Sequence, residues 1–416
     1  MQDVDFSTWI PGWTSLAFVL AYGLLLVRQA IRVRNARESF ASRILVTGSR
    51  GKSGTVRLIH AALRYSGRTA YGKITGTTAV ELIPDGTEVP TVRFGAAGIS
   101  EMPQAMIRAA RAKAEYGIFE CMAISPDLIH LVDAKYVRPS IVVIPTIRLD
   151  HLEDEGLSEL EIGMNIFEAV ADCDYLVTGV DQPELLALYR QWCEAKGITL
   201  IEARPGDETP AVIGHHPTNV EIARQVLLLL GLTAGEAEAG LLTASTEPNA
   251  LNFLSASTEH GITIGLADIG AANDPQSAAE ALAQWPLDDD VVIPIVANRW
   301  DRPLRSVVFA GALLGRFPVI GISGTVFRWV RNLTPGRLSD ERRPYGRAQV
   351  FKLSRSQAGD PERLARTLTR LLGEPGTGRF VLVLMGNTHD AQTARLRDTL
   401  AQRGVRLEMT YQDPVD

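Results

Sequence analysis

Cysteine is scarce in this 416-residue chain, with three residues that lie far apart and form no CxxC pair. Their scarcity excludes a disulfide framework and a four-thiolate zinc site, and it fits a reducing compartment. Lysine is scarce too, because only six lysines stand beside 36 arginines, so a single well-placed lysine is informative. An excess of positive charge is also lacking. The formal net charge of -6 argues against a nucleic-acid partner.

Hydrophobic residues make up 46% of the chain and charged residues 22%, which excludes disorder as the dominant state. The length suits two or three domains of about 100 to 200 residues each. We expect an N-terminal anchor segment with a basic collar over residues 1–40 and two domains over 41–245 and 246–416.

An uncharged stretch of 19 residues runs from Trp9 to Val27. As a helix it would reach about 28 Å, close to the thickness of a bilayer core. Acidic residues precede this stretch and arginines follow it, so the positive-inside rule predicts a single-pass anchor in the cell membrane with the remaining chain in the cytoplasm. A cleavable signal peptide would carry its basic residues before the apolar run. An amphipathic or buried helix is the alternative, because Pro11 and Gly12 weaken the span.

Apolar runs of strand length alternate with helical patterns after the anchor, which predicts an α/β fold with parallel sheets. A stretch rich in Thr, Ala, Gly and Glu, residues 233–249, interrupts the alternation and is the expected domain boundary. The second half restarts the pattern, as in a doubly wound, Rossmann-like domain. The expected strands are 43–47, 116–122, 137–147, 175–180, 198–201, 262–269, 291–297, 318–322, 349–353, 380–385 and 405–409.

A glycine-bearing turn, GSRGKS, lies between the first of these strands and a helix. Glycines let backbone N–H groups converge on phosphate oxygens, a lysine neutralises the phosphates, and a serine hydroxyl ligates magnesium. The motif departs from the full Walker pattern, because Val46 stands five residues before Gly51 where that pattern has glycine. An ordinary turn that caps a helix is the alternative, but lysine followed by serine at this place favours a nucleotide site.

Two acidic segments follow later strands, at the same edge of the predicted sheet. Glu120 in FECMAISPD is a natural magnesium ligand beside a phosphate loop, or else a solvated residue at a strand end. His151 follows Asp150 in RLDHLEDEG, where it could bind a metal or accept a proton. Cys121 is expected to be a buried structural thiol, and His215 with His216 a surface turn.

The ordered set of segments resembles the Mur ligase superfamily and, within it, the catalytic subunits of poly-γ-glutamate synthases of the CapB or PgsB type. The resemblance covers nearly the whole chain, without the N-terminal UDP-binding domain of the peptidoglycan ligases. The segments are GSRGKS, KITGTTA, ECMAISPD, LDHLEDEG, IGAANDPQS, NRWDR and GNTH.

The resemblance implies an ATP-binding central domain over 41–245 and a Rossmann-like ligase domain over 246–416. It also implies ATP and Mg²⁺ as cofactors and gives roles to the matching residues. Lys52, Glu120 and His151 would be catalytic. The nucleotide would be bound by Gly48, Ser49, Arg50, Gly51, Lys52, Ser53, Gly54 and Thr55, and by Asn273, Asp274, Arg299, Asp301, Arg302, Asn387 and His389 from the second domain. The metal ligands would be Ser53, Thr75, Thr77, Glu120 and His151.

Three departures from the family pattern concern the metal site. Thr146 and Arg148 stand where the family often has asparagine and a small apolar or acidic residue. No lysine lies between His151 and Lys196, so the carbamylated lysine of several Mur ligases lacks an obvious counterpart here. Another group must then help to place magnesium.

The activity implied is polymerisation of glutamate through its γ-carboxylate, by way of an acyl phosphate. The resemblance also implies a small multi-spanning membrane subunit and an extracellular accessory subunit as partners. The base for the incoming amine, the glutamate stereoisomer and the oligomeric state stay open, with a homo-oligomer as one option. A folylpolyglutamate-synthase-like ligase and an NTP-driven switch or transport subunit are the alternatives.

Overall fold

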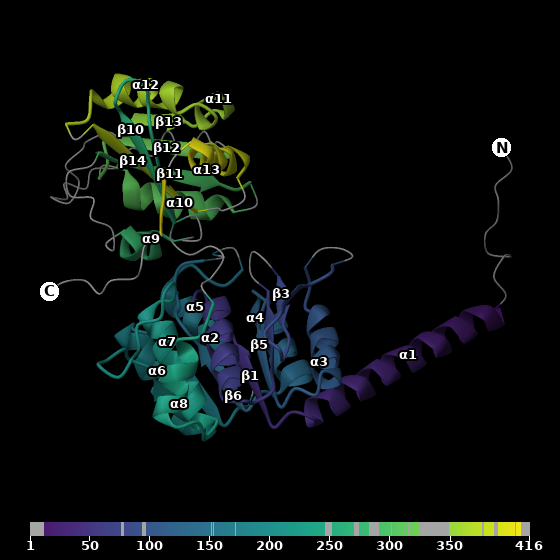
Figure 1. The fold of residues 1–416 in the computed structure, drawn as a ribbon. Helices are drawn as coiled ribbons and strands as arrows, with labels where there is room; N and C mark the ends of the chain where they lie inside the picture. Colours follow the sequence, from purple (N-terminus) through teal and green to yellow (C-terminus); the bar gives the residue numbers. More distant parts are fainter. Residues whose placement is uncertain are drawn as a thin grey trace, which may run out of the picture.

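The structure is a computed structural model, and its described residues form one long helix and two α/β domains (Figure 1). Each domain is built on its own sheet. The described residues are 12–75, 79–93, 97–150, 152, 154–170, 172–245, 252–269, 274–282, 291–300, 302–314, 316–324, 349–376, 378–386, 390–403 and 405–408.

Helix α1 (Gly12–Glu38) carries the apolar stretch expected of an anchor. Residues Trp13–Glu38 are long and apolar enough to cross a membrane, and almost none of this stretch is buried in the protein. The helix projects away from the first domain beside α3 (Glu101–Arg111) in Figure 1. Its last turns are different, because Val33 and Ala36 pack into the core of the first domain together with Phe40.

The first sheet has the strand order β4-β3-β2-β5-β1-β6-β7-β8 within the described residues. The strands from β2 to β8 in this order are parallel, while β3 and β4 add an antiparallel edge that the sequence analysis did not predict. Their bounds are β1 (Ser42–Val46), β2 (Ala70–Ile74), β3 (Val80–Leu82), β4 (Glu88–Pro90), β5 (Tyr116–Glu120), β6 (Ile141–Ile144), β7 (Tyr175–Thr178) and β8 (Thr199–Glu202).

Helices cover both faces of this sheet and bury two apolar cores. The end of α1 and helices α3 to α6 lie on one face, whereas α2, α7 and α8 lie on the other. The remaining bounds are α2 (Lys52–Tyr65), α4 (Pro126–His130), a π-helical segment Leu131–Val137, α5 (Glu159–Ala169), α6 (Pro183–Lys196), α7 (Pro217–Leu229) and α8 (Ala234–Leu241).

Two expectations about this domain were wrong. The start of the predicted strand 137–147 belongs partly to the π-helical segment, so the strand begins only at Ile141. The stretch expected to interrupt the alternation contains α8, which begins at a capping box between Thr233 and Glu236. This helix packs closely on α2, since a Cβ on Gly240 would meet the Ala62 backbone. Gly240 in this stretch therefore marks close packing of α8 on α2, whereas a Cβ on Gly235 would meet nothing within 4 Å.

The second sheet has the order β13-β12-β11-β14-β10-β9-β15 among the described residues. It confirms the doubly wound expectation from β13 to β10, while at one edge β9 runs antiparallel to both β10 and β15. The elements are β9 (Asn252–Ser257), β10 (Thr263–Asp268), α9 (Pro275–Leu282), β11 (Val291–Asn298), α10 (Pro303–Leu313), β12 (Val319–Gly324), β13 (Gln349–Lys352), α11 (Arg355–Ala358), α12 (Pro361–Leu372), β14 (Arg379–Met385), α13 (Ala391–Arg403) and β15 (Val405–Glu408).

The second domain meets the first at the carboxyl ends of the parallel strands. Helices α9 and α10 lie on the side of the second domain that faces the first (Figure 1). Arg302 and Arg305, at the start of α10, form ion pairs with Asp150, which follows β6. Polar residues after several strands are thereby collected between two domains.

Candidate active site

The phosphate loop connects β1 to α2 in a conformation that requires glycine. Gly48 and Gly51 have φ angles of 118° and 81°, a region that residues with a Cβ rarely adopt. A Cβ on Gly48 would lie 3.2 Å from the Thr146 carbonyl oxygen, and one on Gly51 would collide with the side chain of Asn219 on α7. The loop is therefore closely packed, and its glycines leave the backbone N–H groups at the start of α2 accessible for an anion.

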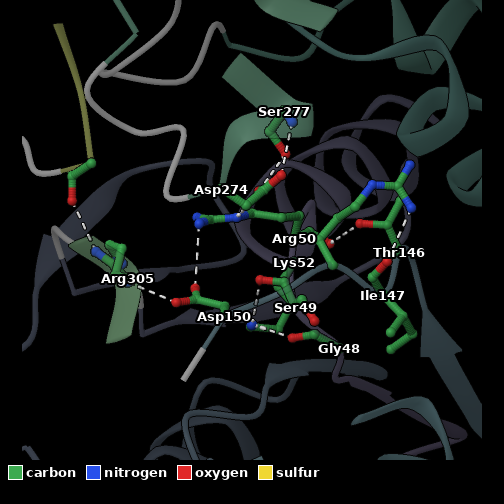
Figure 2. A network of polar contacts seen from close by, with 12 residues as sticks. Gly48, Ser49, Arg50, Lys52, Thr146, Ile147, Asp150, Asp274, Ser277 and Arg305 are labelled. Atoms are coloured by element: carbon green, nitrogen blue, oxygen red, sulfur yellow. Dashed lines mark hydrogen bonds and ion pairs between the residues drawn. The ribbon is translucent and has the colours of Figure 1, made fainter. Parts of the chain in front are cut away.

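Lys52 and Ser53, the first residues of α2, point toward the loop and the neighbouring strand. The Lys52 ammonium donates hydrogen bonds to the carbonyl oxygens of Gly48 and Ser49, the second at 3.3 Å (Figure 2). The Ser53 hydroxyl donates to Glu120 Oε2 at 3.0 Å. Since β1 pairs with β5 in a register that sets Val46 beside Glu120, this carboxylate reaches the loop from the adjacent strand end.

Glu120 is buried, with 3% of its surface exposed, so the alternative of a solvated residue at a strand end was wrong. Its Oε2 also accepts the backbone N–H of Thr75 at 2.9 Å. Glu120, Ser53 and Thr75 are thus brought together, Thr75 through its backbone N–H, and their role as metal ligands stays a prediction.

The loop fits a nucleotide phosphate and a magnesium ion. The Ser49 hydroxyl oxygen is buried and has no hydrogen-bond partner among the residues that the structure describes, so an oxygen-rich ligand would satisfy it. In the described part of the chain no three His, Cys, Asp or Glu side chains gather into a metal site of their own. Magnesium commonly takes one or two protein carboxylates and completes its shell with phosphate oxygens and water. Ser53 and Glu120 supply protein oxygens of that kind.

The two departures after β6 have separate structural roles. Thr146 forms an antiparallel bridge with Arg50, accepts the Ser49 N–H at 3.0 Å through its carbonyl, and donates its hydroxyl to the Arg50 carbonyl at 3.4 Å. Arg148 forms a bidentate pair with Asp181 at 3.0 and 3.1 Å. Thr146 therefore holds the phosphate loop, and the Arg148 guanidinium is directed to the segment after β7.

Ion pairs between charged side chains of the two domains connect the domains next to the phosphate loop. Arg50 of the loop lies 3.6 Å from Asp274, the residue before α9 (Figure 2). Arg50 also lies 3.3 Å from Asp150, which in turn lies 3.3 Å from Arg302 and 2.7 Å from Arg305. Burial lowers the pKa of the Arg305 guanidinium to about 10. Arg50, Asp274 and Arg302 were predicted for this site, whereas Arg305 was not.

Glu155 is a second residue that the sequence analysis did not single out, although it belongs to the quoted LDHLEDEG segment. Its side chain is buried, and Oε2 has no hydrogen-bond partner among the described residues. Burial raises the pKa of this carboxyl to about 7, Asp150 raises it further, and Lys52, Arg50 and Arg302 act in the opposite direction. A buried carboxyl near the phosphate-loop lysine would therefore change its protonation state close to neutral pH.

Several predicted residues lie outside the described part of the chain, and their roles stay predictions. They are Thr77, His151, Asn273, Asp301, Asn387 and His389. Among the described ones, Gly54 and Thr55 are buried in the first turn of α2, where the Thr55 hydroxyl donates to the Gly51 carbonyl. Arg299 follows β11, and its carbonyl accepts the Arg302 N–H at 3.4 Å.

Two expectations about cysteine and histidine had different outcomes. Cys121 is buried, and burial raises the pKa of its thiol to about 11, which confirms a structural thiol. The surface turn expected at His215 was wrong. His215 is buried and shares a hydrogen bond with the Ser245 carbonyl, while the His216 ring accepts the Thr218 N–H at the start of α7.

The chain matches two family models in tandem. Residues 46–221 match the Mur ligase middle domain, and residues 254–403 match the poly-gamma-glutamate synthase CapB C-terminal domain. The first model covers the domain with the phosphate loop, and the second covers most of the domain that contributes Asp274, Arg302 and Arg305.

Relatives and a solved structure agree with this assignment. The capsule biosynthesis protein CapB of Bacillus anthracis is 28% identical over 313 residues, 71% of this chain and 65% of that protein. The PGA synthase CapB of Bacillus subtilis (strain 168) is 26% identical over 72% of this chain and 77% of that protein. The bifunctional folylpolyglutamate synthase/dihydrofolate synthase of Yersinia pestis, complexed with AMPPNP and a Mn ion, has a TM-score of 0.59 at 18% identity, covering 90% of this chain and 92% of that one.

The chain thus belongs to the Mur ligase superfamily of ATP-dependent ligases, and its second domain is of the CapB type found in poly-γ-glutamate synthases. It spans just under two thirds of the length of the B. anthracis relative.

Proposed function

We propose that this chain is a membrane-anchored, ATP-dependent amide ligase that lengthens poly-γ-glutamate through the γ-carboxylate at the chain end. The observation that carries the proposal is that Lys52, Ser53 and Glu120 lie together at the phosphate loop, next to the ion pairs that connect the two domains. The CapB relatives support glutamate as the substrate. Helix α1 and its arginines support a single-pass anchor with both domains in the cytoplasm.

The first chemical step is activation of the chain end. A γ-carboxylate oxygen attacks the γ-phosphorus of ATP, the bond between the β- and γ-phosphates breaks, and ADP leaves an acyl phosphate behind. Lys52 and the backbone N–H groups of the loop offset the charge on the transferred phosphoryl group. Magnesium, when held by Ser53 and Glu120, supplies further positive charge to the phosphate oxygens.

The second step is amide formation. The α-amino nitrogen of the incoming glutamate attacks the acyl carbon, phosphate leaves, and a proton leaves the nitrogen. Glu155 Oε2 accepts this proton, because it is a buried carboxylate oxygen without a hydrogen-bond partner in the described part of the chain, and its carboxyl has a pKa near neutrality. The pairs of Asp150 with Arg302 and Arg305 hold the second domain over the site, where water would otherwise hydrolyse the acyl phosphate.

Partner subunits form a separate part of the proposal. One apolar helix offers no polar path for a charged polymer, so export requires other membrane proteins. A small multi-spanning subunit and an extracellular accessory subunit would meet this requirement. Gly23 lies on an open part of α1, where a Cβ would meet nothing within 4 Å, so a partner helix can approach there.

The test is ADP release from membranes that contain the full-length chain and its partners, supplied with L-glutamate, D-glutamate or neither. We expect ADP release that depends on one of the two stereoisomers and stops in Lys52→Ala. Lys113→Ala, an exposed lysine far from the loop in sequence, is the control and should keep the activity. Polymer and ADP made by Lys52→Ala would contradict the proposal, and glutamate-independent hydrolysis would favour an NTP-driven switch.

A second candidate comes from the fold, which the chain shares with a folylpolyglutamate synthase. A ligase of that kind would add glutamates to a small folate acceptor. ADP release that requires a folate as well as glutamate would favour this candidate, whereas elongation of poly-γ-glutamate without folate would exclude it.

A further inference from the structure

A cavity of about 340 Å³ lies between α1 and α3, on the part of the first domain where α1 leaves the protein. Arg28 and Arg32 line it from α1, and Arg108 and Arg111 line it from α3. These spacings of three and four residues place each pair on one face of its helix. Four arginines, two from each helix, therefore line one small space.

The charge of this cavity is largely uncompensated. Arg108 pairs with Glu81 at 2.7 Å, but Arg28, Arg32 and Arg111 form no ion pair with any residue that the structure describes. Beyond the cavity, Arg34 pairs with Glu38 on α1. Three free guanidinium groups thus leave a positive site that fits an anion with several oxygens.

The apolar residues that line the cavity indicate the depth at which it would lie in a membrane. Leu25 on α1 and Ile107 on α3 also line it, and Leu25 belongs to the exposed apolar part of the helix. From Leu25 to Arg32 a helix rises about 10 Å, close to the depth of a headgroup layer on one side of a bilayer. With α1 across a membrane, the cavity opens where hydrocarbon gives way to headgroups.

We propose that this cavity is a binding site for the phosphate headgroup of an anionic phospholipid. The proposal rests on the membrane anchor of the proposed function, but not on the ligase reaction. The arginines bind the phosphate oxygens, and Leu25 and Ile107 contact the apolar start of the acyl chains. A bound lipid would fix α1 against α3 at the membrane surface.

A lipid fits this cavity better than the anionic product does. The γ-carboxylates of poly-γ-glutamate would approach from water, and they need no apolar wall. The cavity begins directly after the apolar stretch of α1, where lipid headgroups are the nearest anions. Juxtamembrane arginines also gain about 1 kcal/mol each from anionic lipids.

The test uses the full-length chain in nanodiscs that contain equal amounts of phosphatidylglycerol and phosphatidylcholine. Native mass spectrometry then counts the lipids that stay bound after release. We expect wild type to retain phosphatidylglycerol preferentially, and Arg32→Gln with Arg111→Gln to lower this preference about tenfold. The matched control is Arg34→Gln with Lys113→Gln, which removes the same charge near both helices, outside the cavity, and should keep the preference.

Four outcomes would overturn the proposal. The first is an equal loss in the control, which would show a diffuse attraction of the whole basic collar. The second is binding of inorganic phosphate or soluble poly-γ-glutamate in phosphatidylcholine nanodiscs with the same dependence on Arg32 and Arg111. The third is a chain that stays in the nanodiscs without any lipid preference. This result would agree with the membrane anchor but would exclude the lipid-binding site. A chain that the nanodiscs do not retain would overturn the anchor as well, while ADP release tests the ligase reaction separately.

Discussion

Arg305 Nη2 of the second domain lies 2.7 Å from Oδ1 of Asp150 in the first domain. Both side chains are mostly buried, and Arg305 also donates to the Gly386 carbonyl at 2.9 Å. Asp150 therefore balances guanidinium groups from both domains at the point where the domains meet.

Replacing Asp150 by asparagine should weaken the contact between the domains. Removal of one partner from a buried ion pair costs about 3 kcal/mol, because the remaining charges stay buried without compensation. Chemical denaturation of Asp150→Asn should show this loss, and small-angle scattering should show a larger radius of gyration.

The control for this prediction is Glu202→Gln, which breaks the more exposed bidentate pair with Arg190. A surface pair contributes about 1 kcal/mol or less. Equal losses in the two variants would contradict the role given to Asp150.

Gly51→Ala should lower the affinity for ATP. Alanine is strained at the φ of 81° that Gly51 adopts, and its Cβ would also collide with the side chain of Asn219. Gly67→Ala is a matched control, since its φ is 75° and nothing lies within 4 Å of the added Cβ. Isothermal titration with ADP should show a loss for Gly51→Ala only. Asn219→Ala should restore part of it, and failure of this rescue would show that backbone strain alone is responsible.

Glu120→Gln should separate metal binding from folding. The amide oxygen can still accept the Ser53 hydroxyl and the Thr75 N–H, so the thermal midpoint should change little. A neutral amide is a poor magnesium ligand, so Mn²⁺ binding in the presence of ADP, measured by electron paramagnetic resonance, should weaken about tenfold or more. Unchanged Mn²⁺ affinity would remove Glu120 from the metal site.

Glu155→Gln should raise stability and lower activity. In the folded state the pKa of this carboxyl is about 7, above the ordinary value of 4.5, because burial disfavours the charged form. Between these two pH values the folded state binds more protons than the unfolded state, so wild-type stability falls as pH rises. The difference corresponds to roughly 3 kcal/mol above pH 7. Glutamine avoids this loss, so the variant should unfold at higher denaturant at pH 8 and differ little at pH 4.5.

The activity of Glu155→Gln gives an independent readout. Without a proton acceptor, amide formation should slow more than phosphoryl transfer, so ADP release should exceed amide formation as the acyl phosphate hydrolyses. Glu155→Asp should restore part of the coupling. Full coupling in Glu155→Gln would exclude this residue as the base.

Local sequence signals were sufficient for much of the fold. The phosphate loop could be predicted because GSRGKS combines turn, helix start and phosphate chemistry within six residues. The apolar runs of β5, β7 and β14 were equally clear, since parallel strands buried on both faces are almost continuously apolar. The strands β2, β3, β4 and β9 were missed. Of these, β3 and β4 have only three residues each, which is too short to show an alternating pattern.

Long-range contacts explain what was missed in the site. Arg305 lies within a helical pattern, and nothing in that pattern shows that it reaches Asp150, which is 155 positions earlier. Glu155 stands in a run of acidic residues that is typical of a solvated loop, and only the folded chain shows that it is buried. Asn219 likewise reaches the phosphate loop through the packing of α7 on α2.

Helix α1 is one unbroken rod of 27 residues, about 40 Å long, and its last turns form part of the domain core. A connection of this kind is rigid, because no flexible linker separates the helix from the domain. In the proposed membrane arrangement the two domains would not move on a flexible linker, and each copy would present the same side to the bilayer. The height and direction from which a growing polymer leaves the site would then be set by a single helix, and lengthening or kinking α1 would move the exit point without changing any residue of the site.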